Sequence, residues 1–79
     1  MELKTLLAKI HKYIEIKEGS DISREKMALR IGVKPRTYTE YRRGTNQPLA
    51  MKALLNLLVE LTDEEIIEVV RLWDNKQNN

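Results

Sequence analysis

The chain is predicted to be all-α, with five helices, and three observations lead to this class. Apolar residues recur at three- and four-residue spacing along most of the sequence, which is the period of an amphipathic helix. Glycine and proline stand between these stretches, where helices end and begin. The length of 79 residues suits one small domain, residues 1–79, with a modest core.

The first helix is predicted at residues 2–17 and ends near Gly19. Six apolar side chains fall on one face of it at helical spacing: Leu3, Leu6, Leu7, Ile10, Tyr13 and Ile14. The second helix is predicted to start after Ser23, which is a good N-cap residue. Ile22 is expected to meet Met27 across this start as a hydrophobic staple.

Glycine and proline then set the boundaries of the middle helices. The second helix is predicted to end near Ile31, because Gly32 adopts positive φ without strain and turns the chain. Pro35 suits the first position of a third helix, where its missing N–H has no intrahelical partner in any case. That helix is predicted to run to Arg43 and to stop at Gly44.

The last two predicted helices, at residues 49–61 and 63–75, are strongly apolar and follow a polar loop. The second of them starts at a capping box of Thr62 and Glu65, and residues 76–79 are expected to form a frayed tail. Both helices carry apolar residues on several sides and so need cover on several sides. We expect a second copy to supply it, through a dimer interface on the last helix: Ile67, Val70 and Trp73.

Charge is distributed unevenly along the chain. Residues 24–52 carry eight basic and two acidic side chains, a net charge of +6, whereas residues 53–79 carry two basic and six acidic, a net charge of −4. Basic residues also occupy two helix starts, where acidic residues are normally favoured: Arg24, Lys26, Lys34 and Arg36. A polyanion would supply the missing negative charge, so the basic third is a candidate surface for one.

Two short helices joined by a glycine turn, at about residues 23–43, form the pattern of a helix-turn-helix. This motif needs a small residue where the helices cross, which Ala28 provides, and a turn residue, which Gly32 provides. Five apolar side chains fall at spacings that should face inward: Met27, Ile31, Val33, Tyr38 and Tyr41.

With these features, the stretch from Ser23 to Leu61 resembles the lambda-repressor-like, or Xre-type, helix-turn-helix family of DNA-binding proteins. Members show the alanine, the glycine-turn-apolar step, the inward aromatic or apolar pair, the closing glycine and a Pro-containing loop before an apolar helix. The resemblance implies a five-helix lambda-repressor-like DNA-binding domain and double-stranded DNA as the partner. Lys34, Pro35 and Arg36 depart from the family's usual residues, so its base preference is not carried over.

Site residues follow from the resemblance together with the helical geometry. With Tyr38 and Tyr41 inward, the outer face of the third helix carries the expected base-reading residues: Pro35, Arg36, Thr39 and Glu40. Arg36 is expected to read guanine as a bidentate donor. The expected phosphate contacts are Arg24, Lys34, Thr37, Arg43, Thr45, Asn46 and Gln47.

Simpler interpretations stand beside these. The cations also fit ordinary surface charge, and Arg36 also fits a plain phosphate contact. Glu40 fits a base contact, a residue that orients Arg36, or a solvated side chain. Arg42 fits a position over Tyr38 or a pairing with an acid elsewhere, and His11, the only histidine, is expected at the surface rather than in a metal site.

Several classes of function are disfavoured. The chain has no cysteine, no nucleophile–base pair, no glycine-rich phosphate loop and no zinc spacing, so we expect neither an enzyme nor a cofactor or metal. The charged N-terminus does not resemble a signal peptide. The longest apolar run, at residues 53–61, is interrupted by Asn56 and Glu60 and is too short to span a membrane. A cytoplasmic location with no membrane association is expected.

Three functions are compatible with this sequence. The leading one is a small transcriptional regulator, a repressor that binds a palindromic operator sequence-specifically as a homodimer. The second is the antitoxin of a toxin-antitoxin pair, with a toxin partner covering the apolar C-terminal helices. The third is a protein-protein interaction module that keeps the fold without binding DNA.

Overall fold

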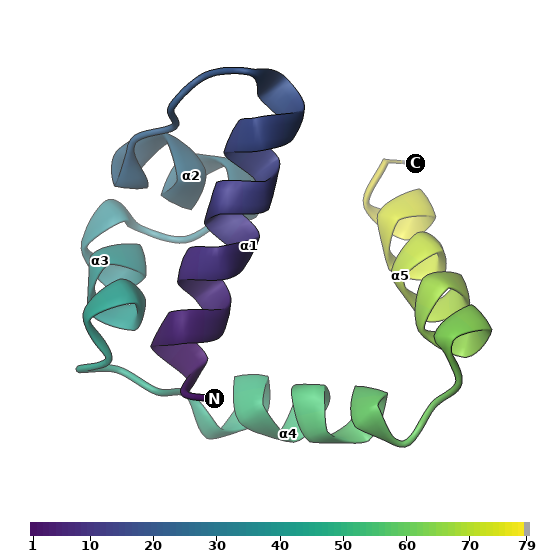
Figure 1. Ribbon diagram of the computed structural model, residues 1–79. Coiled ribbons are helices and arrows are strands. Elements are labelled where there is room, and N and C mark those ends of the chain that lie inside the picture. The colour runs from purple at the N-terminus through teal and green to yellow at the C-terminus, as the bar shows by residue number, and fades with distance from the viewer. Residues whose placement is uncertain (79) are drawn as a thin grey trace. The chain divides into compact units, whose positions relative to one another are not determined.

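The structure is a computed structural model that describes residues 1–78, with side chains described to residue 75. Over these residues it contains five helices and no strand, which confirms the all-α prediction. The helices are α1 (Leu3–Glu18), α2 (Arg24–Ile31), α3 (Pro35–Arg43), α4 (Leu49–Val59) and α5 (Asp63–Asn78), as Figure 1 shows. Where the sequence predicts one domain, the chain forms two compact units, Met1–Pro48 and Leu49–Asn79.

Local signals account for most helix boundaries. The Ser23 hydroxyl accepts a hydrogen bond from the Lys26 amide at 3.1 Å, as an N-cap should. Thr62 and Glu65 form the predicted capping box, with each side chain bonded to the other residue's amide at 3.2 and 2.9 Å. Pro35 is in the first turn of α3, as predicted.

Two boundaries differ from the prediction for residues 49–61 and 63–75. Helix α4 ends at Val59, because the next two amides donate to carbonyls three residues back, and this tighter turn ends the α-helical pattern. Helix α5 continues to Asn78, so residues 76–78 are helical rather than frayed. No glycine or proline occurs in this stretch to stop the helix. Asn79 lies outside the described residues.

The core of the Met1–Pro48 unit forms where three helices meet. Helix α3 packs against both α2 and α1, and Figure 1 shows α2 and α3 on one side of α1. Met27, Ala28 and Tyr38 are buried at the centre, and four partly buried side chains pack around them: Ile14, Ile22, Val33 and Tyr41. Ile22 packs against the cluster that contains Met27, which is compatible with the predicted staple.

One predicted core residue is wrong. Ile31 is 51% exposed, whereas Val33, also predicted to face inward, packs against the core. Gly32 has a φ of 84°, and the Val33 amide donates to the Ala28 carbonyl at 3.0 Å. This is a Schellman end, which turns the second residue after the helix back toward the preceding turn. The turn therefore brings Val33, not Ile31, to the core.

The described side chains of the Leu49–Asn79 unit are less deeply buried than those of the first unit. Among the described side chains of α4 and α5 none is fully buried, and those at Met51, Leu55, Leu58 and Ile66 are half-buried. Nine large apolar side chains are exposed: Leu49, Leu54, Leu57, Val59, Ile67, Val69, Val70, Leu72 and Trp73. Within residues 1–78, no helix combines the length and the apolar character needed to cross a membrane.

Candidate nucleic-acid interface

Helix α3 has an inner face, which packs on the core, and an outer face, which we call the open face and which carries Arg36 and Glu40. On the inner side Tyr38 is 2% exposed, and Tyr41 packs against the same core. On the opposite side the Arg36 side chain is 92% exposed, and its Nε lies 3.9 Å from an oxygen of Glu40, one helical turn away. Arg36 therefore extends from the surface with a carboxylate beside it, the arrangement expected if Glu40 orients Arg36.

The other residues predicted on α3 surround this pair. Pro35 and Arg43 are exposed, whereas Thr37 and Thr39 are half-buried. Pro35 and Thr39 lie toward one edge of the open face and Thr37 toward the other, as follows from 3.6 residues per turn. The structure thus brings the predicted base-reading residues to one side of one short helix.

The start of α3 is polar and uncapped. Lys34 is the N-cap residue, and no side chain caps the helix. The first helical donor is the Tyr38 amide, which donates to the Lys34 carbonyl at 3.0 Å. The amides of Arg36 and Thr37 come before it, so the helix itself offers them no acceptor. These two N–H groups and the two neighbouring cations form a site suited to an anion.

The loop after α3 is largely occupied by its own hydrogen bonds. The amides of Thr45 and Asn46 donate to the Glu40 carbonyl at 3.1 and 3.4 Å, and the Thr45 hydroxyl donates to the same oxygen at 3.3 Å. The Gln47 side-chain amide donates to the Gly44 carbonyl at 3.2 Å. Of the three loop side chains predicted to contact phosphate, that of Asn46 is the one without a hydrogen bond among the described residues.

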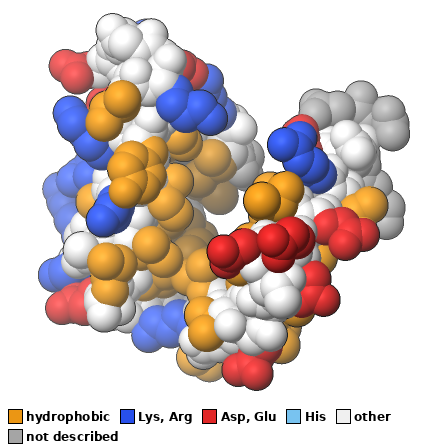
Figure 2. Space-filling model, turned by 45° about the vertical axis from the view of Figure 1, so that its right-hand side comes forward, with side chains coloured by type: hydrophobic (Ala, Val, Ile, Leu, Met, Phe, Trp, Pro, Cys, Tyr) orange, Lys and Arg blue, Asp and Glu red, His pale blue; other side chains and the backbone are white. Residues whose placement is uncertain are grey.

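The basic side chains of α2 and α3 fall into two groups. Arg30 pairs with Glu18, Arg36 lies near Glu40, and Arg42 lies against the core. The remaining four have no ion-pair partner within the part of the chain that is described: Arg24, Lys26, Lys34 and Arg43. Figure 2 shows Lys and Arg side chains along one edge of the Met1–Pro48 unit.

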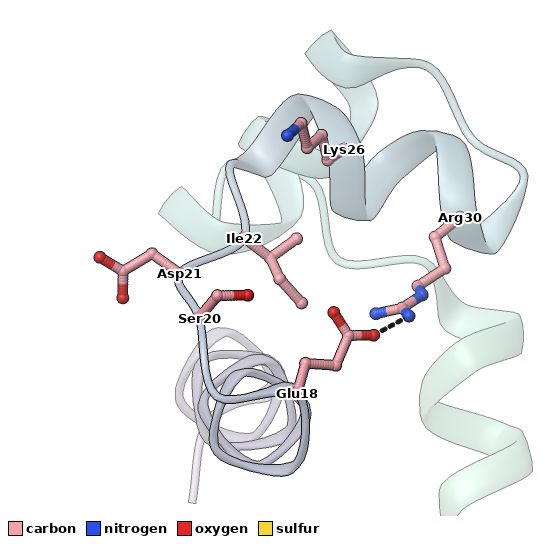
Figure 3. Close-up of a pocket in the computed structure, with 6 residues that line it drawn as sticks. All are labelled: Glu18, Ser20, Asp21, Ile22, Lys26 and Arg30. Carbon is pink, nitrogen blue, oxygen red and sulfur yellow. Dashed lines mark hydrogen bonds and ion pairs between the residues drawn. The ribbon is translucent and has the colours of Figure 1, made fainter.

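A shallow pocket lies between the end of α1 and α2. Its volume is about 250 Å³, and its lining combines acidic, basic and polar groups: Glu18, Ser20, Asp21, Ile22, Lys26 and Arg30. In Figure 3 the carboxylate of Glu18 meets the guanidinium of Arg30 across the pocket, and Asp21 points away. Since Arg30 is neutralised by Glu18, it adds little to the positive edge.

Lys4 packs on the end of α3, a contact that the sequence did not predict. A Cβ placed on Gly44 would lie 2.9 Å from the Lys4 Cδ, so the aliphatic stem of Lys4 runs across the end of α3. Its ammonium group lies 3.7 Å from a Glu2 carboxylate oxygen in an exposed pair. No local pattern could have shown this contact, because the two residues lie at opposite ends of the unit's sequence.

The surface position predicted for His11 is wrong, because its side chain is 6% exposed. Its two ring nitrogens contact the Tyr38 hydroxyl at 2.8 Å and the Ile22 carbonyl at 2.7 Å. One sequence signal did point inward, since His11 shares the apolar face of Leu7 and Ile14 at helical spacing. Flanking lysines obscured that signal.

Arg42 takes the first of the two positions left open by the sequence. Its guanidinium carbon lies 5.8 Å from the centre of the Tyr38 ring, and Nη1 lies 3.0 Å from the Nδ1 atom of His11. Arg42 is therefore part of the inner face of α3 and is not available on the open face.

The residues predicted for a dimer interface are all exposed on α5. Ile67 and Val70 are each 54% exposed, and Trp73 is 65% exposed. They recur every three residues and so follow one side of the helix. Acidic and apolar side chains are both exposed on this unit in Figure 2.

Across residues 1–78, no group of three or more His, Cys, Asp or Glu side chains is arranged to hold a metal ion.

Protein-family models, curated proteins and solved structures were each compared with this chain, and none of them matches it.

Proposed function

We propose that this protein binds double-stranded DNA sequence-specifically through α3, as a small helix-turn-helix transcriptional regulator of the lambda-repressor-like type. One observation carries the proposal: α3 is anchored by Tyr38 on one face and presents Arg36, 92% exposed, on the other. Four cations without ion-pair partners among the described residues lie on α2 and α3 or at the start of α3: Arg24, Lys26, Lys34 and Arg43. A rigid helix with an exposed arginine, surrounded by cations, suits the major groove of a duplex.

Phosphate contacts would position the protein without reading sequence. Lys34 and the amides of Arg36 and Thr37 form the anion site at the start of α3, and Arg24 adds a cation at the start of α2. Arg43 and Asn46 extend these contacts to the other end of α3. Counterion release from such contacts makes binding weaken with salt, with a log-log slope of about −0.9 per phosphate neutralised.

Base reading would come from the open face of α3. The Arg36 guanidinium matches O6 and N7 of guanine, and such bidentate contacts discriminate against other bases by about 1–3 kcal/mol. Glu40 favours this geometry by holding the arginine from one side. Pro35 and Thr39 complete the reading face, the proline through apolar contact and the threonine through its methyl or hydroxyl group.

A repressor acting on a palindromic operator needs two copies, and the Leu49–Asn79 unit offers the surface for pairing. Its nine exposed large apolar side chains exceed what a monomer ordinarily leaves in water. A standard interface takes about 800 Å² from each partner. A two-fold dimer formed through Ile67, Val70 and Trp73 would present two α3 helices about 34 Å apart, one helical turn of DNA.

The test is selection from a random duplex library by the purified protein, followed by sequencing of the retained DNA. We expect an enriched inverted repeat, and loss of preference at one guanine position in the Arg36→Ala variant. Arg71→Ala removes a cation of α5 and serves as the matched control, which should retain the selected sequence. A salt-independent, unselective interaction with DNA would contradict the proposal.

The antitoxin hypothesis predicts a different result from the same material. The apolar surface that suits a second copy would also suit a second, smaller protein. Expression from the native locus, with purification through this chain, would then yield a stoichiometric partner bound to α4 and α5. DNA selection that succeeds only with this partner would favour the antitoxin over the autonomous repressor.

A further inference from the structure

A buried polar cluster lies on the side of α3 opposite to the proposed DNA surface. We call it the His11 cluster: the side chains of His11, Glu15, Tyr38 and Arg42, and the backbone of Ile22. Its members come from α1, from the loop before α2 and from α3. The His11 and Tyr38 rings are stacked, with centroids 5.8 Å apart and planes inclined by 25°. The proposed contacts with DNA leave this cluster unused.

The partners of His11 determine which form of its ring fits. The Ile22 carbonyl, 2.7 Å from Nε2, can only accept a hydrogen bond, so Nε2 must carry the proton. Arg42 Nη1, 3.0 Å from Nδ1, can only donate, so Nδ1 must offer its lone pair. The Tyr38 hydroxyl, at 2.8 Å, is a second donor and shares this one lone pair with Arg42. The hydrogen-bond partners thus assign the Nε2–H tautomer.

Glu15 completes the cluster on the α1 side. Its carboxylate accepts from the Ile22 amide at 2.8 Å and lies 3.7 Å from Nε2 of His11. Both backbone polar groups of Ile22 are therefore held by side chains of α1. Ile22 immediately precedes the Ser23 N-cap, so α1 holds the start of α2 through one nitrogen of His11 and holds α3 through the other.

The geometry points to a function for this connection. Tyr38 and Arg42 lie one turn apart on the inner side of α3, and Arg36 and Glu40 lie one turn apart on the open side. Residues two apart differ by about 200° around a helix, so the two pairs oppose each other. Fixing the inner pair fixes the rotation of α3 and therefore the direction in which Arg36 points.

We propose that His11, in its Nε2–H form, is a positioning residue for the DNA-reading face of α3, an inference that rests on the proposed function. An apolar side chain of similar size would fill the same volume. It would leave the Tyr38 hydroxyl, the Ile22 carbonyl and the Arg42 guanidinium without their partner, and buried polar groups favour rearrangements that restore one. Rotation of α3 is the rearrangement that would misdirect Arg36.

The first experiment examines the ring without DNA. Correlation of ring carbon-bound protons with the two ¹⁵N nuclei of His11 distinguishes the tautomers, and the single histidine makes the assignment unambiguous. We expect Nε2 to carry the proton and Nδ1 to carry none, because of the partners that the two nitrogens face. A protonated Nδ1 would overturn the assignment and, with it, the proposed connection to Arg42.

The second experiment measures discrimination, as the ratio of affinities for the selected duplex and a scrambled one. His11→Gln keeps an N–H donor for Ile22 and replaces the Nδ1 acceptor with an amide oxygen at a different position, and Tyr38→Phe keeps the ring and removes the donor. Each should lower the ratio by about tenfold, and the double variant by little more, because both remove one contact. Lys12→Ala, at an exposed neighbouring position, is the control and should leave the ratio unchanged.

The outcomes separate this inference from the proposed function. Discrimination by the unsubstituted protein, together with an unchanged ratio in folded His11→Gln and Tyr38→Phe, would overturn the positioning role alone. An unsubstituted protein that does not discriminate would overturn the proposed function itself. A purely stabilising role would lower the melting temperature and leave the ratio intact, so melting curves are recorded beside each titration. If His11→Gln does not fold, Tyr38→Phe decides.

Discussion

Arg36 and Arg42 belong to the same short helix but have opposite surroundings. Arg36 is almost fully exposed and lies 3.9 Å from Glu40, whereas Arg42 lies over the Tyr38 ring and donates to His11. The Nε atom of Arg42 is buried without a hydrogen-bond partner among the described residues. At the scale of single residues, one of these two arginines of α3 therefore packs against the core, and the other extends into solvent with its N–H donors exposed.

Gly44 gives a prediction at this scale. It has a φ of 80°, and an added Cβ would lie 2.9 Å from the Lys4 stem, whereas at Gly19, with a φ of 72°, an added Cβ meets nothing within 4 Å. Both Gly→Ala changes carry the left-handed penalty of about 1–2 kcal/mol. Gly44→Ala should cost more, by about 0.5 kcal/mol, because the flexible lysine stem must also move.

Chemical denaturation of the two variants measures this difference in the free energy of unfolding. Combining Gly44→Ala with Lys4→Ala should remove the excess and leave only the left-handed penalty. Equal costs for Gly44→Ala and Gly19→Ala would show that Lys4 does not pack on the end of α3.

At the scale of helices, the termini divide into capped and uncapped ones. The starts of α2 and α5 are held by Ser23 and by the Thr62–Glu65 box, whereas α3 begins at Lys34 with no side-chain cap. The uncapped helix is the one that presents Arg36. An open helix start beside two cations is destabilising in isolation and favourable next to a phosphate, which is the behaviour of a binding surface.

The capping box of α5 gives the prediction at this scale. Thr62→Ala should weaken the start of α5 by about 1 kcal/mol, because the Glu65 amide loses its side-chain acceptor. Amide hydrogen exchange should quicken in the first turn of α5 and remain unchanged in α2. Ser23→Ala is the reciprocal control, with faster exchange in α2 alone. A uniform change along the chain in either variant would contradict the two-unit organisation.

At the scale of the whole molecule, the two units carry different surfaces. Residues 1–48 have eleven basic and six acidic side chains, for a net charge of +5, and residues 49–79 have three basic and six acidic, for a net charge of −3. The first unit has a buried core, while described side chains of the second are exposed or half-buried. Such a division fits one unit that contacts a polyanion and another that contacts protein.

The prediction at this scale concerns oligomeric state. The protein should scatter light as a dimer of its 9.3 kDa chain, and Trp73→Ala should shift it toward the monomer, since buried tryptophans commonly contribute about 2 kcal/mol or more at interface centres. Ile16→Ala is a matched control, because Ile16 and Trp73 are both 65% exposed and lie in different units. A monomer at tens of micromolar would contradict the dimer.

Most of the helical framework could be predicted, and the site only partly. Ser23, Pro35, Gly44 and Thr62 act on neighbours within a few residues, so their roles were readable from spacing alone. The open face of α3 followed from its period once Tyr38 was placed inward. His11 and Lys4 could not be assigned, because their partners lie far along the chain and polar side chains are ordinarily expected in water.

By itself the sequence determined the helical class, nearly all helix starts and ends, the charge asymmetry and the identity of the residues on the open face of α3. These depend on local backbone preferences and on helical period, which act over a few residues. Tertiary structure alone decided that His11 is buried, that Lys4 crosses Gly44 and that Arg42 turns inward. The reason is physical: each of these depends on a partner brought close by folding, and a buried polar group is stable only where that partner lies within hydrogen-bond reach.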